Sequence, residues 1–308
     1  MPKREVGHPA FPNPLLLAVA VIAAVSSISF ASIFVRLADA PPAAVAAYRV
    51  SIAMAAIAPY LAWKGMGEKT SWTLRAFLLS ALSGVFLAFH FLFWIRSLYM
   101  TSVACSAALV GTIPLFTALF SRYFRHEPLN RSMNPGLFLA VSGSALVAGM
   151  DFTLSTTALL GDILAILGAV MAAAYLECGR VARRSLGAAP YAFAVYGSAA
   201  LVLLASCAAS NTPLTGFTPQ TYLFLVLLAL IPQLIGHTTF NWTLRFLPPT
   251  LVAVLILGEP VGATILAWVL LGETVSLPKA AGLLVLGTGI LIASMSLRVQ
   301  DQDDMRSS

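Results

Sequence analysis

The sequence predicts an all-α integral membrane protein with ten transmembrane helices arranged as two inverted five-helix repeats. Three observations support this fold class: an apolar composition, a series of apolar segments long enough to span a bilayer, and landmarks that recur at one fixed offset. Hydrophobic residues make up 59% of the 308 residues, charged residues make up 10%, and the mean hydropathy is +0.89. A soluble domain of this length does not need so apolar a composition to fill its core, so most of the chain is expected to lie in lipid.

The apolar segments have the length that a membrane helix requires, because a bilayer core of about 30 Å takes about 20 residues. The fifth segment is short, and the eighth is long and is expected to be interrupted at Pro232. Residues 1–13 are expected to form a disordered cytoplasmic lead, and residues 298–308 a cytoplasmic tail that is polar and disordered from Gln300 to Ser308. The ten predicted spans are 14–35, 42–63, 76–97, 101–122, 134–150, 158–180, 190–209, 219–244, 249–271 and 279–297.

Four landmarks recur after 146 residues, in the pairs Pro114 and Pro260, Glu127 and Glu273, Gly136 and Gly282, and Gly143 and Gly289. A similar arrangement of spans surrounds each copy, which predicts repeats over 14–150 and 158–297. Because each repeat has five spans, an odd number, the second must enter the membrane opposite to the first. Inverted repeats of this kind are typical of secondary transporters, whose binding site lies near the bilayer midplane between the repeats.

Lys and Arg are distributed unevenly over the predicted loops. If the N-terminus is inside the cell, 14 of the 18 lie on the cytoplasmic side, three lie outside, and Arg49 lies within a span. Cytoplasmic loops carry such an excess of positive residues, so both termini are predicted to be cytoplasmic. The net charge of +6 follows from this bias and does not require a nucleic-acid partner.

Arg49 and Glu259 are ionisable residues predicted deep in the bilayer, where such groups usually face the protein interior or a water-filled cavity. Arg49 can hold a substrate carboxylate with its fork of donors; a structural tie to helix-end carbonyls or to an acidic partner is the alternative. Glu259 can bind a substrate ammonium or exchange a proton; an ion pair with Arg49 is the alternative.

Polar side chains in the eighth and third spans form two further candidate groups. Gln233, His237 and Asn241 are spaced four residues apart and share one face of a helix. His90 and Trp94 have the same spacing in the third span. These groups must point away from lipid, toward a pathway or toward a partner helix, where the histidines would make interhelical hydrogen bonds and the tryptophan would be an interfacial anchor.

Tyr175 in the sixth span adds an aromatic ring to these candidates. Aromatic rings beside a few donors and acceptors suit an apolar or aromatic solute with a zwitterionic end. A multiply charged phosphate would require several deep cations, and only Arg49 is available. The predicted substrate-binding set is therefore His90, Trp94, Tyr175, Gln233, His237, Asn241, Arg49 and Glu259.

Pro114 and Pro260 are predicted as hinges, because a proline within a span removes a backbone hydrogen bond and opens a kink. A static kink that helps helices to pack is the alternative. Glu127 and Glu273, at opposite membrane faces, are expected to be turn or packing residues.

The sequence contains no motif of a known intramembrane enzyme: His-Glu-x-x-His, Gly-x-Ser-x-Gly and a phosphate-binding glycine loop are all missing. We therefore predict that the protein is not an enzyme and has no cofactor. The cysteines have no metal-ligand spacing, so no metal site is predicted. No nucleotide-hydrolysing motif is present either. Transport down a gradient is slightly favoured, because deep carboxylates are few, and proton exchange through Glu259 or the histidines is the alternative.

The ten spans, the early Arg49 and the two proline-to-glutamate blocks resemble the EamA family of the drug/metabolite transporter superfamily. The second block, from Pro260 through Gly272-Glu273 to Gly289, matches the family pattern more closely than the first, which has His126 before Glu127 in place of glycine. The chain also looks like the YddG-type bacterial amino-acid exporters, a likeness that includes the neighbourhood of His90.

This resemblance implies an exporter of neutral, preferably aromatic or hydrophobic, amino acids and related metabolites, with multiple spans in the bacterial inner membrane and acting by alternating access. The partners expected are a small-molecule substrate and the lipid bilayer, with no nucleic acid, and a monomer is favoured. Export of another small metabolite or drug on the same fold is the alternative, and a channel is a weaker one because no pore-lining ring or filter sequence appears.

Overall fold

The protein is described by a computed structural model over residues 12–64, 72–124, 126, 132–149 and 155–307, and these residues form helices and no strand. The prediction of an all-helical protein is confirmed. In chain order the elements are α1 (Pro14–Ser29), α2 (Ala31–Leu37), α3 (Pro42–Lys64), α4 (Leu74–Leu98), α5 (Val103–Val110), α6 (Ile113–Phe124), α7 (Asn134–Gly149), α8 (Thr156–Ala182), α9 (Ala188–Ala209), α10 (Pro219–Leu228), the π-helix η1 (Ala229–His237), α11 (Thr238–Thr243), α12 (Pro249–Ile256), α13 (Gly258–Leu266), the π-helix η2 (Ala267–Leu271) and α14 (Leu277–Ser307).

Eight helical stretches in the described residues are long and apolar enough to cross a membrane: Pro14–Leu37, Pro42–Trp63, Leu74–Leu98, Val103–Phe124, Thr156–Ala182, Ala188–Ala209, Pro219–Thr243 and Pro249–Leu271. They correspond to eight of the ten predicted spans. The other two correspond to α7, with 16 residues, and to the shorter apolar stretch Leu277–Ala293 of α14. Both stretches are shorter than the eight others, so the number of ten transmembrane helices stays a prediction.

Several spans are interrupted at their middle. The first is divided at Phe30, the fourth at Gly111 and Thr112, and the ninth at Leu257. The eighth contains Pro232, as expected, but continues there as the π-helix η1 rather than breaking. Each interruption frees backbone groups that a membrane helix normally pairs internally, and such groups are tolerated only where protein or a cavity surrounds them.

The C-terminal helix is longer than predicted. Residues 300–307, which the sequence predicts to be disordered, continue α14 to Ser307. This stretch contains neither proline nor glycine, and its Arg, Gln and Met residues are good helix formers, so the helix meets no helix-breaking residue there. The predicted lead falls mostly on residues outside the described ranges.

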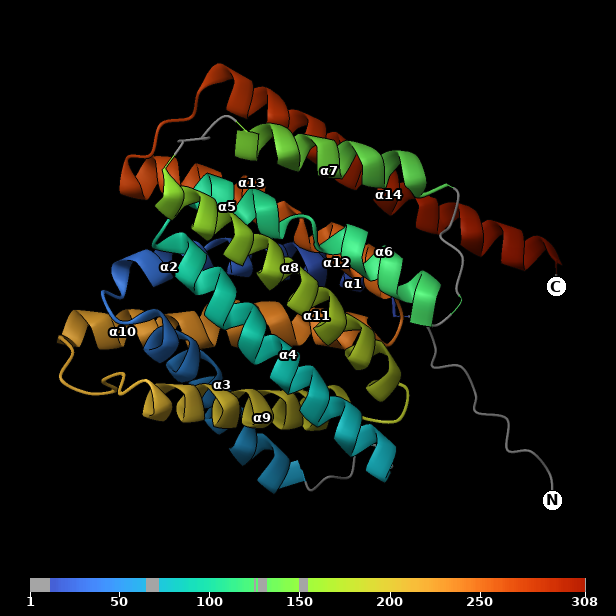
Figure 1. Ribbon diagram of the computed structural model, residues 1–308. Helices are drawn as coiled ribbons and strands as arrows, with labels where there is room; N and C mark the ends of the chain where they lie inside the picture. The colour runs from blue at the N-terminus through green and yellow to red at the C-terminus, as the bar shows by residue number, and fades with distance from the viewer. Residues whose placement is uncertain (1–11, 65–71, 125, 127–131, 150–154, 308) are drawn as a thin grey trace.

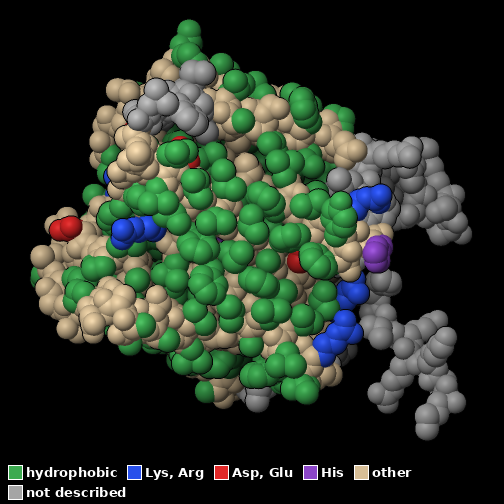
Figure 2. Space-filling model, in the orientation of Figure 1, with side chains coloured by type: hydrophobic (Ala, Val, Ile, Leu, Met, Phe, Trp, Pro, Cys, Tyr) green, Lys and Arg blue, Asp and Glu red, His purple; other side chains and the backbone are tan. Residues whose placement is uncertain are grey.

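The helices lie side by side as one bundle (Figure 1), in which α7 and α14 form one edge and α3 and α9 lie at the opposite edge. Between them, α4 and α8 pack antiparallel: Gly161 of α8 lies against Met100, whereas the Tyr175 carbonyl accepts a hydrogen bond from Ser83. Hydrophobic side chains cover most of the face shown in Figure 2, and most of the charged side chains seen there lie toward its two ends.

Glycines explain how α7 and α14 approach each other. A Cβ added at Gly143 would collide with the backbone of Leu286 and the carbonyl of Gly282, and one added at Gly289 would collide with the backbone of Ala140 and the carbonyl of Gly136. The four glycines that mark the sequence repeat therefore form one reciprocal, antiparallel contact. Close backbone approach through small residues is a common way for membrane helices to associate.

This contact predicts that alanine substitution changes the stability of the protein very differently at two glycines of α14. Gly289→Ala should destabilise the protein by about 1–3 kcal/mol, because a methyl group has no room there. Gly287→Ala is the matched control, because nothing lies within 4 Å of an added Cβ and alanine is the better helix former. Thermal unfolding of both variants in detergent would check this; equal midpoints would contradict the packing argument.

Candidate functional site

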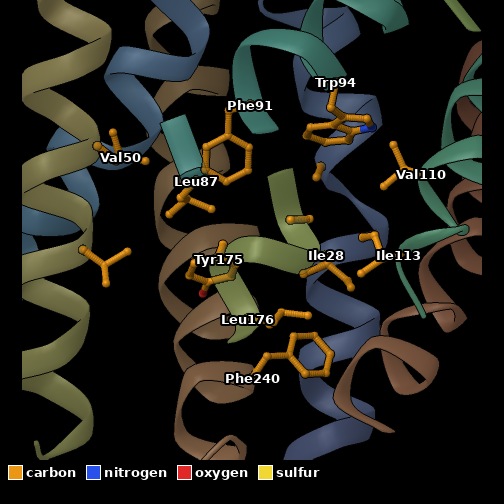
Figure 3. Close-up of a cluster of buried hydrophobic side chains, with 14 of the residues drawn as sticks. Ile28, Val50, Leu87, Phe91, Trp94, Val110, Ile113, Tyr175, Leu176 and Phe240 are labelled. Atoms are coloured by element: carbon orange, nitrogen blue, oxygen red, sulfur yellow. The ribbon is translucent and has the colours of Figure 1, made fainter. Parts of the chain in front are cut away.

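A cavity lies at the centre of the bundle, where the interrupted spans meet. Its volume is about 30 Å³, which is room for about two water molecules. Figure 3 shows Trp94, Val110, Ile113 and Tyr175 converging on this region from different helices. The lining residues are Ile28, Arg49, His90, Trp94, Val110, Ile113, Ala172, Tyr175, Leu176, His237, Phe240, Ile256 and Glu259.

Most of these lining residues occur in pairs that are 146 or 147 positions apart. The pairs are Ile28 with Tyr175, His90 with His237, Trp94 with Phe240, Val110 with Ile256, and Ile113 with Glu259. The offset is the one that relates the two sequence repeats. Both halves of the chain therefore contribute equivalent positions to one central cavity, and the polarity differs most in two pairs, Ile28 with Tyr175 and Ile113 with Glu259.

Arg49 of α3 is almost completely buried, with 1% of its surface exposed. Its Nε donates a hydrogen bond of 2.6 Å to Oε1 of Gln233, and its guanidinium carbon lies 4.1 Å from the ring centre of Phe91 and 5.6 Å from that of Trp94. No ion pair joins Arg49 and Glu259 in the part of the chain that the structure describes. The aromatic faces and one amide stabilise this cation, and Nη1 has no hydrogen-bond partner among the described residues.

The π-helix η1 positions Gln233. The Gln233 carbonyl accepts hydrogen bonds from the hydroxyls of Thr238 (3.3 Å) and Tyr196 (3.4 Å), and the Gln233 side chain reaches Arg49. A π-bulge shifts the residues after it relative to a regular helix and is frequent at functional sites. Gln233 is therefore placed behind the cavity, where it holds Arg49, and is not among the lining residues.

His90 and Trp94 form one stacked unit on α4. Their rings are 6.0 Å apart with an interplanar angle of 2°, and His90 Nδ1 lies 2.9 Å from the Gly168 carbonyl. A carbonyl only accepts, so Nδ1 carries the proton of this hydrogen bond. Trp94 is 3% exposed, and its Nε1 has no acceptor within the described residues. Its burial places it in the protein interior, away from a lipid interface.

Tyr175 and Asn241 are joined by a hydrogen bond from the tyrosine hydroxyl to Oδ1 of the amide. Tyr175 lines the cavity and lies 6.5 Å from the ring of His237. Asn241 is buried behind it, and its backbone carbonyl accepts from Nε of Arg183 at 2.9 Å. Asn241 therefore supports Tyr175 from behind, as Gln233 supports Arg49.

Glu259 lies in the first turn of α13, directly after the interruption of the ninth span. The positive end of a helix dipole favours a carboxylate at that position. The equivalent residue of the first repeat is Ile113, which also begins a half-helix and also lines the cavity. The cavity therefore has an acidic group on one side only.

The two predicted hinge prolines occupy equivalent places after a helix break. Pro114 is the second residue of α6, and Pro260 is the third residue of α13. The breaks before them, at Gly111–Thr112 and at Leu257, lie beside the cavity residues Val110 and Ile256. The prolines thus mark real interruptions of the helix.

Six of the eight predicted substrate-binding residues line the cavity, and the remaining two contact them from behind. The sequence analysis missed the apolar members of the lining, which are Ile28, Val110, Ile113, Ala172, Leu176, Phe240 and Ile256. The repeat offset alone points to Phe240, which follows Trp94 by 146 positions. Of the paired glutamates, Glu273 accepts a hydrogen bond from the Val103 backbone at 3.4 Å, at the start of α5; Glu127 lies outside the described residues.

Comparison with known proteins identifies the protein family. The model of the EamA-like transporter family matches residues 14–149 and again residues 159–295. The chain belongs to the EamA-like transporter family. These two matches occupy nearly the same residues as the two halves expected from the landmark offset.

Two relatives of this EamA-like transporter are themselves named as transporters. The uncharacterized transporter YxxF of Bacillus subtilis (strain 168) is 23% identical over 233 residues, covering 75% of this chain and 74% of its own. An uncharacterized transporter of Archaeoglobus fulgidus is 27% identical over 275 residues, covering 86% of this chain and 92% of its own. The chain is thus a multi-pass membrane protein of a transporter family.

A solved structure described only as "Crystal structure of protein" shares the fold of this EamA-like transporter. It has a TM-score of 0.72 and 20% sequence identity, and the match covers 92% of this chain and 98% of the other. Identity at this level shows the fold alone. In the described residues no group of three or more His, Cys, Asp or Glu side chains could hold a metal ion.

Proposed function

We propose that this protein is a secondary transporter that exports neutral amino acids, preferably aromatic or hydrophobic ones, across the bacterial inner membrane, with both termini cytoplasmic. The observation that carries the proposal is the central cavity, in which Arg49 and Glu259 share one aromatic and aliphatic lining. A guanidinium suits a carboxylate, and a carboxylate suits an ammonium group. The net charge of these two residues is zero, as it is in a neutral amino acid.

Donors without partners support the carboxylate side of this site. Nη1 of Arg49 and Nε1 of Trp94 are both buried and both lack an acceptor within the described part of the chain. Buried donors usually have a partner, and leaving one unpaired costs about 1–3 kcal/mol. An acceptor-only group such as a carboxylate would satisfy both donors, whereas the remaining lining would contact the apolar side chain of the amino acid.

Alternating access between two inverted repeats is part of the same proposal. It is supported by the antiparallel contact of α7 with α14, because helices at equivalent positions in the two repeats must run in opposite directions if the repeats are inverted. The small cavity also supports it: an amino acid needs more space than about two water molecules occupy, so the helices around the cavity must move during transport.

A counterflow screen of the neutral amino acids in proteoliposomes tests this function. Saturable exchange of phenylalanine, leucine or similar solutes is expected. Exchange of none of them would refute the amino-acid proposal and leave another small metabolite or drug as the substrate. Flux that does not saturate would indicate a channel instead.

A helix break that acts as a hinge predicts a specific kinetic effect for Pro260. Pro260→Ala restores a backbone N–H to the interrupted span and should lower the maximal rate of counterflow several-fold, because a continuous helix resists bending. Protein abundance and the unfolding midpoint should stay close to those of the parent protein. Pro219→Ala is the matched control, because Pro219 begins α10 and is exposed. An unchanged rate in Pro260→Ala would indicate a static kink.

A further inference from the structure

Arginines tie the helices together at both ends of the bundle. We call these the Arg36 end, with Arg36 and the turn 99–102, and the Arg183 end, with Arg183 and the turn 244–248. They lie at opposite ends of α8, since Gly161 near its start contacts Met100, whereas Arg183 follows its last residue.

At the Arg36 end, the first span is bonded to the turn between the third and fourth spans. Nη2 of Arg36, at the end of α2, donates a hydrogen bond of 2.8 Å to the Thr101 carbonyl. The Tyr99 hydroxyl donates across the same boundary, to the carbonyls of Val35 (3.2 Å) and Ala40 (3.0 Å). These bonds join α2 to the junction of α4 and α5.

At the Arg183 end, the sixth span is bonded to the turn between the eighth and ninth spans. Nη1 of Arg180 donates to the carbonyls of Leu244 (2.8 Å) and Leu247 (3.1 Å), and Nε of Arg183 donates to the Asn241 carbonyl (2.9 Å). The Arg180 bonds join the end of α8 to the turn between α11 and α12, and the Arg183 bond joins it to α11 itself.

The two sets of bonds occupy equivalent places in the two repeats. Arg36 and Arg183 are 147 positions apart, and Thr101 and Leu247 are 146 positions apart, the same offsets that relate the cavity residues. Leu247 accepts from Arg180, one turn before Arg183. One kind of contact is therefore built twice, once at each end of the bundle.

Each set of bonds also closes around one half of the cavity lining. At the Arg36 end it joins the spans that contribute Ile28, Trp94 and Val110. At the Arg183 end it joins the spans that contribute the equivalent residues Tyr175, Phe240 and Ile256. A solute that leaves the cavity between these spans must separate an arginine from its carbonyls.

We propose that Arg36 at one end, and Arg180 with Arg183 at the other, are equivalent clamps that hold the two exits of the central cavity shut and are released in turn. This proposal rests on the proposed alternating access, but not on the identity of the substrate. Both clamps are closed in the structure, which agrees with a cavity too small for an amino acid. The helix breaks at Phe30 and at Leu257 provide places where a released span can bend.

Arginine bonds to helix-end carbonyls also stabilise helices without any role in movement. The two roles differ in what the loss of one clamp does. A purely structural bond would loosen the protein without preference for a side. A clamp would open the cavity toward its own end and leave the other end closed.

Side-specific labelling of a cavity cysteine separates these outcomes. Ala172 of α8 lines the cavity and is replaced by cysteine in a protein whose own cysteines, Cys105, Cys178 and Cys207, are replaced by alanine or serine. A membrane-impermeant charged maleimide is applied to intact cells, which expose one face, and to inside-out vesicles, which expose the other. No substrate is needed.

Arg36→Ala should raise the labelling rate from the face of the Arg36 end on the order of tenfold, the population change that follows from loss of one charged hydrogen bond. The double variant Arg180→Ala/Arg183→Ala should raise it from the opposite face by at least as much. Arg96→Ala, exposed in the last turn of α4, and Arg184→Ala, exposed beside Arg183, are the matched controls and should label as the parent does.

Unchanged labelling in both clamp variants, or an equal rise from both faces, would overturn the proposal. If Arg36→Ala folds poorly, Arg36→Lys keeps a charged donor and should label at a rate between those of the parent and the alanine variant. The labelling pattern is independent of the counterflow screen. A transporter of another solute would still show the two clamps, whereas an amino-acid exporter without clamps would pass the screen and fail the labelling.

Discussion

Replacement of Arg49 by methionine should raise the KM for phenylalanine counterflow on the order of 100-fold, the effect of losing one strong charged hydrogen bond in a buried site. Methionine keeps much of the length and apolar volume of the side chain, so the packing on Phe91 and Trp94 is largely retained. Arg49→Lys keeps the charge but not the planar fork and should recover only part of the affinity. The measurement is counterflow over a range of substrate concentrations in proteoliposomes.

Ligands that lack the carboxylate make this test specific to recognition. In the parent protein, phenethylamine should compete with phenylalanine far more weakly than phenylalanine itself. In Arg49→Met the two ligands should compete almost equally, because the group that distinguishes them has lost its partner. Arg122→Met, at an exposed position of α6, is the matched control. Equal weakening of both ligands in Arg49→Met would show that Arg49 holds the fold rather than the carboxylate.

Glu259→Gln should have the complementary effect, with a KM for phenylalanine raised on the order of 10- to 100-fold because the ammonium group loses its charged partner. 3-Phenylpropionate has the carboxylate but no amine, so it should bind the parent and the variant with equal affinity. Competition assays against labelled phenylalanine check both expectations.

The control for this variant is Glu273→Gln. Glu273 is a carboxylate of the same repeat that contacts the backbone of Val103, away from the cavity lining. The Glu273→Gln variant should keep the parent's preference among phenylalanine, phenethylamine and 3-phenylpropionate. A Glu259→Gln protein with unaltered phenylalanine affinity would remove the glutamate from the proposed site and leave Arg49 as its only charged anchor.

The architecture was largely predictable from the sequence because the bilayer imposes it. Length and hydropathy locate the spans, and Pro114 and Pro260 mark two of the helix interruptions, whereas the break at Phe30 has no proline near it and the helix continues through Pro232. The offset of 146 predicted more than the repeat, since the same glycines turned out to be the points where α7 and α14 touch. The end of α14 is harder to predict, because polarity after residue 299 is equally compatible with disorder and with an exposed helix, and the structure has a helix there.

The site was less predictable, because polarity alone identifies residues that avoid lipid and does not say what they face. Gln233 and Asn241 belong to a polar stripe with His237, but they lie behind the cavity. The π-helix η1, which changes the helical period before Asn241, is not apparent from the sequence. Phe240 is not predictable from polarity, because an apolar aromatic residue in a membrane span can face lipid or the protein interior. Only the repeat offset from Trp94 places it at the cavity.

The difference between the two halves of the cavity has a consequence for energetics. Glu259 has the uncharged Ile113 as its counterpart, and Arg49 has Val195 or Tyr196 at 146 or 147 positions beyond it. With both groups ionised, a nearly twofold scaffold would carry an electric dipole whose direction is fixed relative to the helices. On the proposed function, a zwitterion would align its own dipole against this one and keep that orientation whichever side is open. The loaded and the empty site would then carry the same net charge, so the membrane potential would perform no work on the exchange.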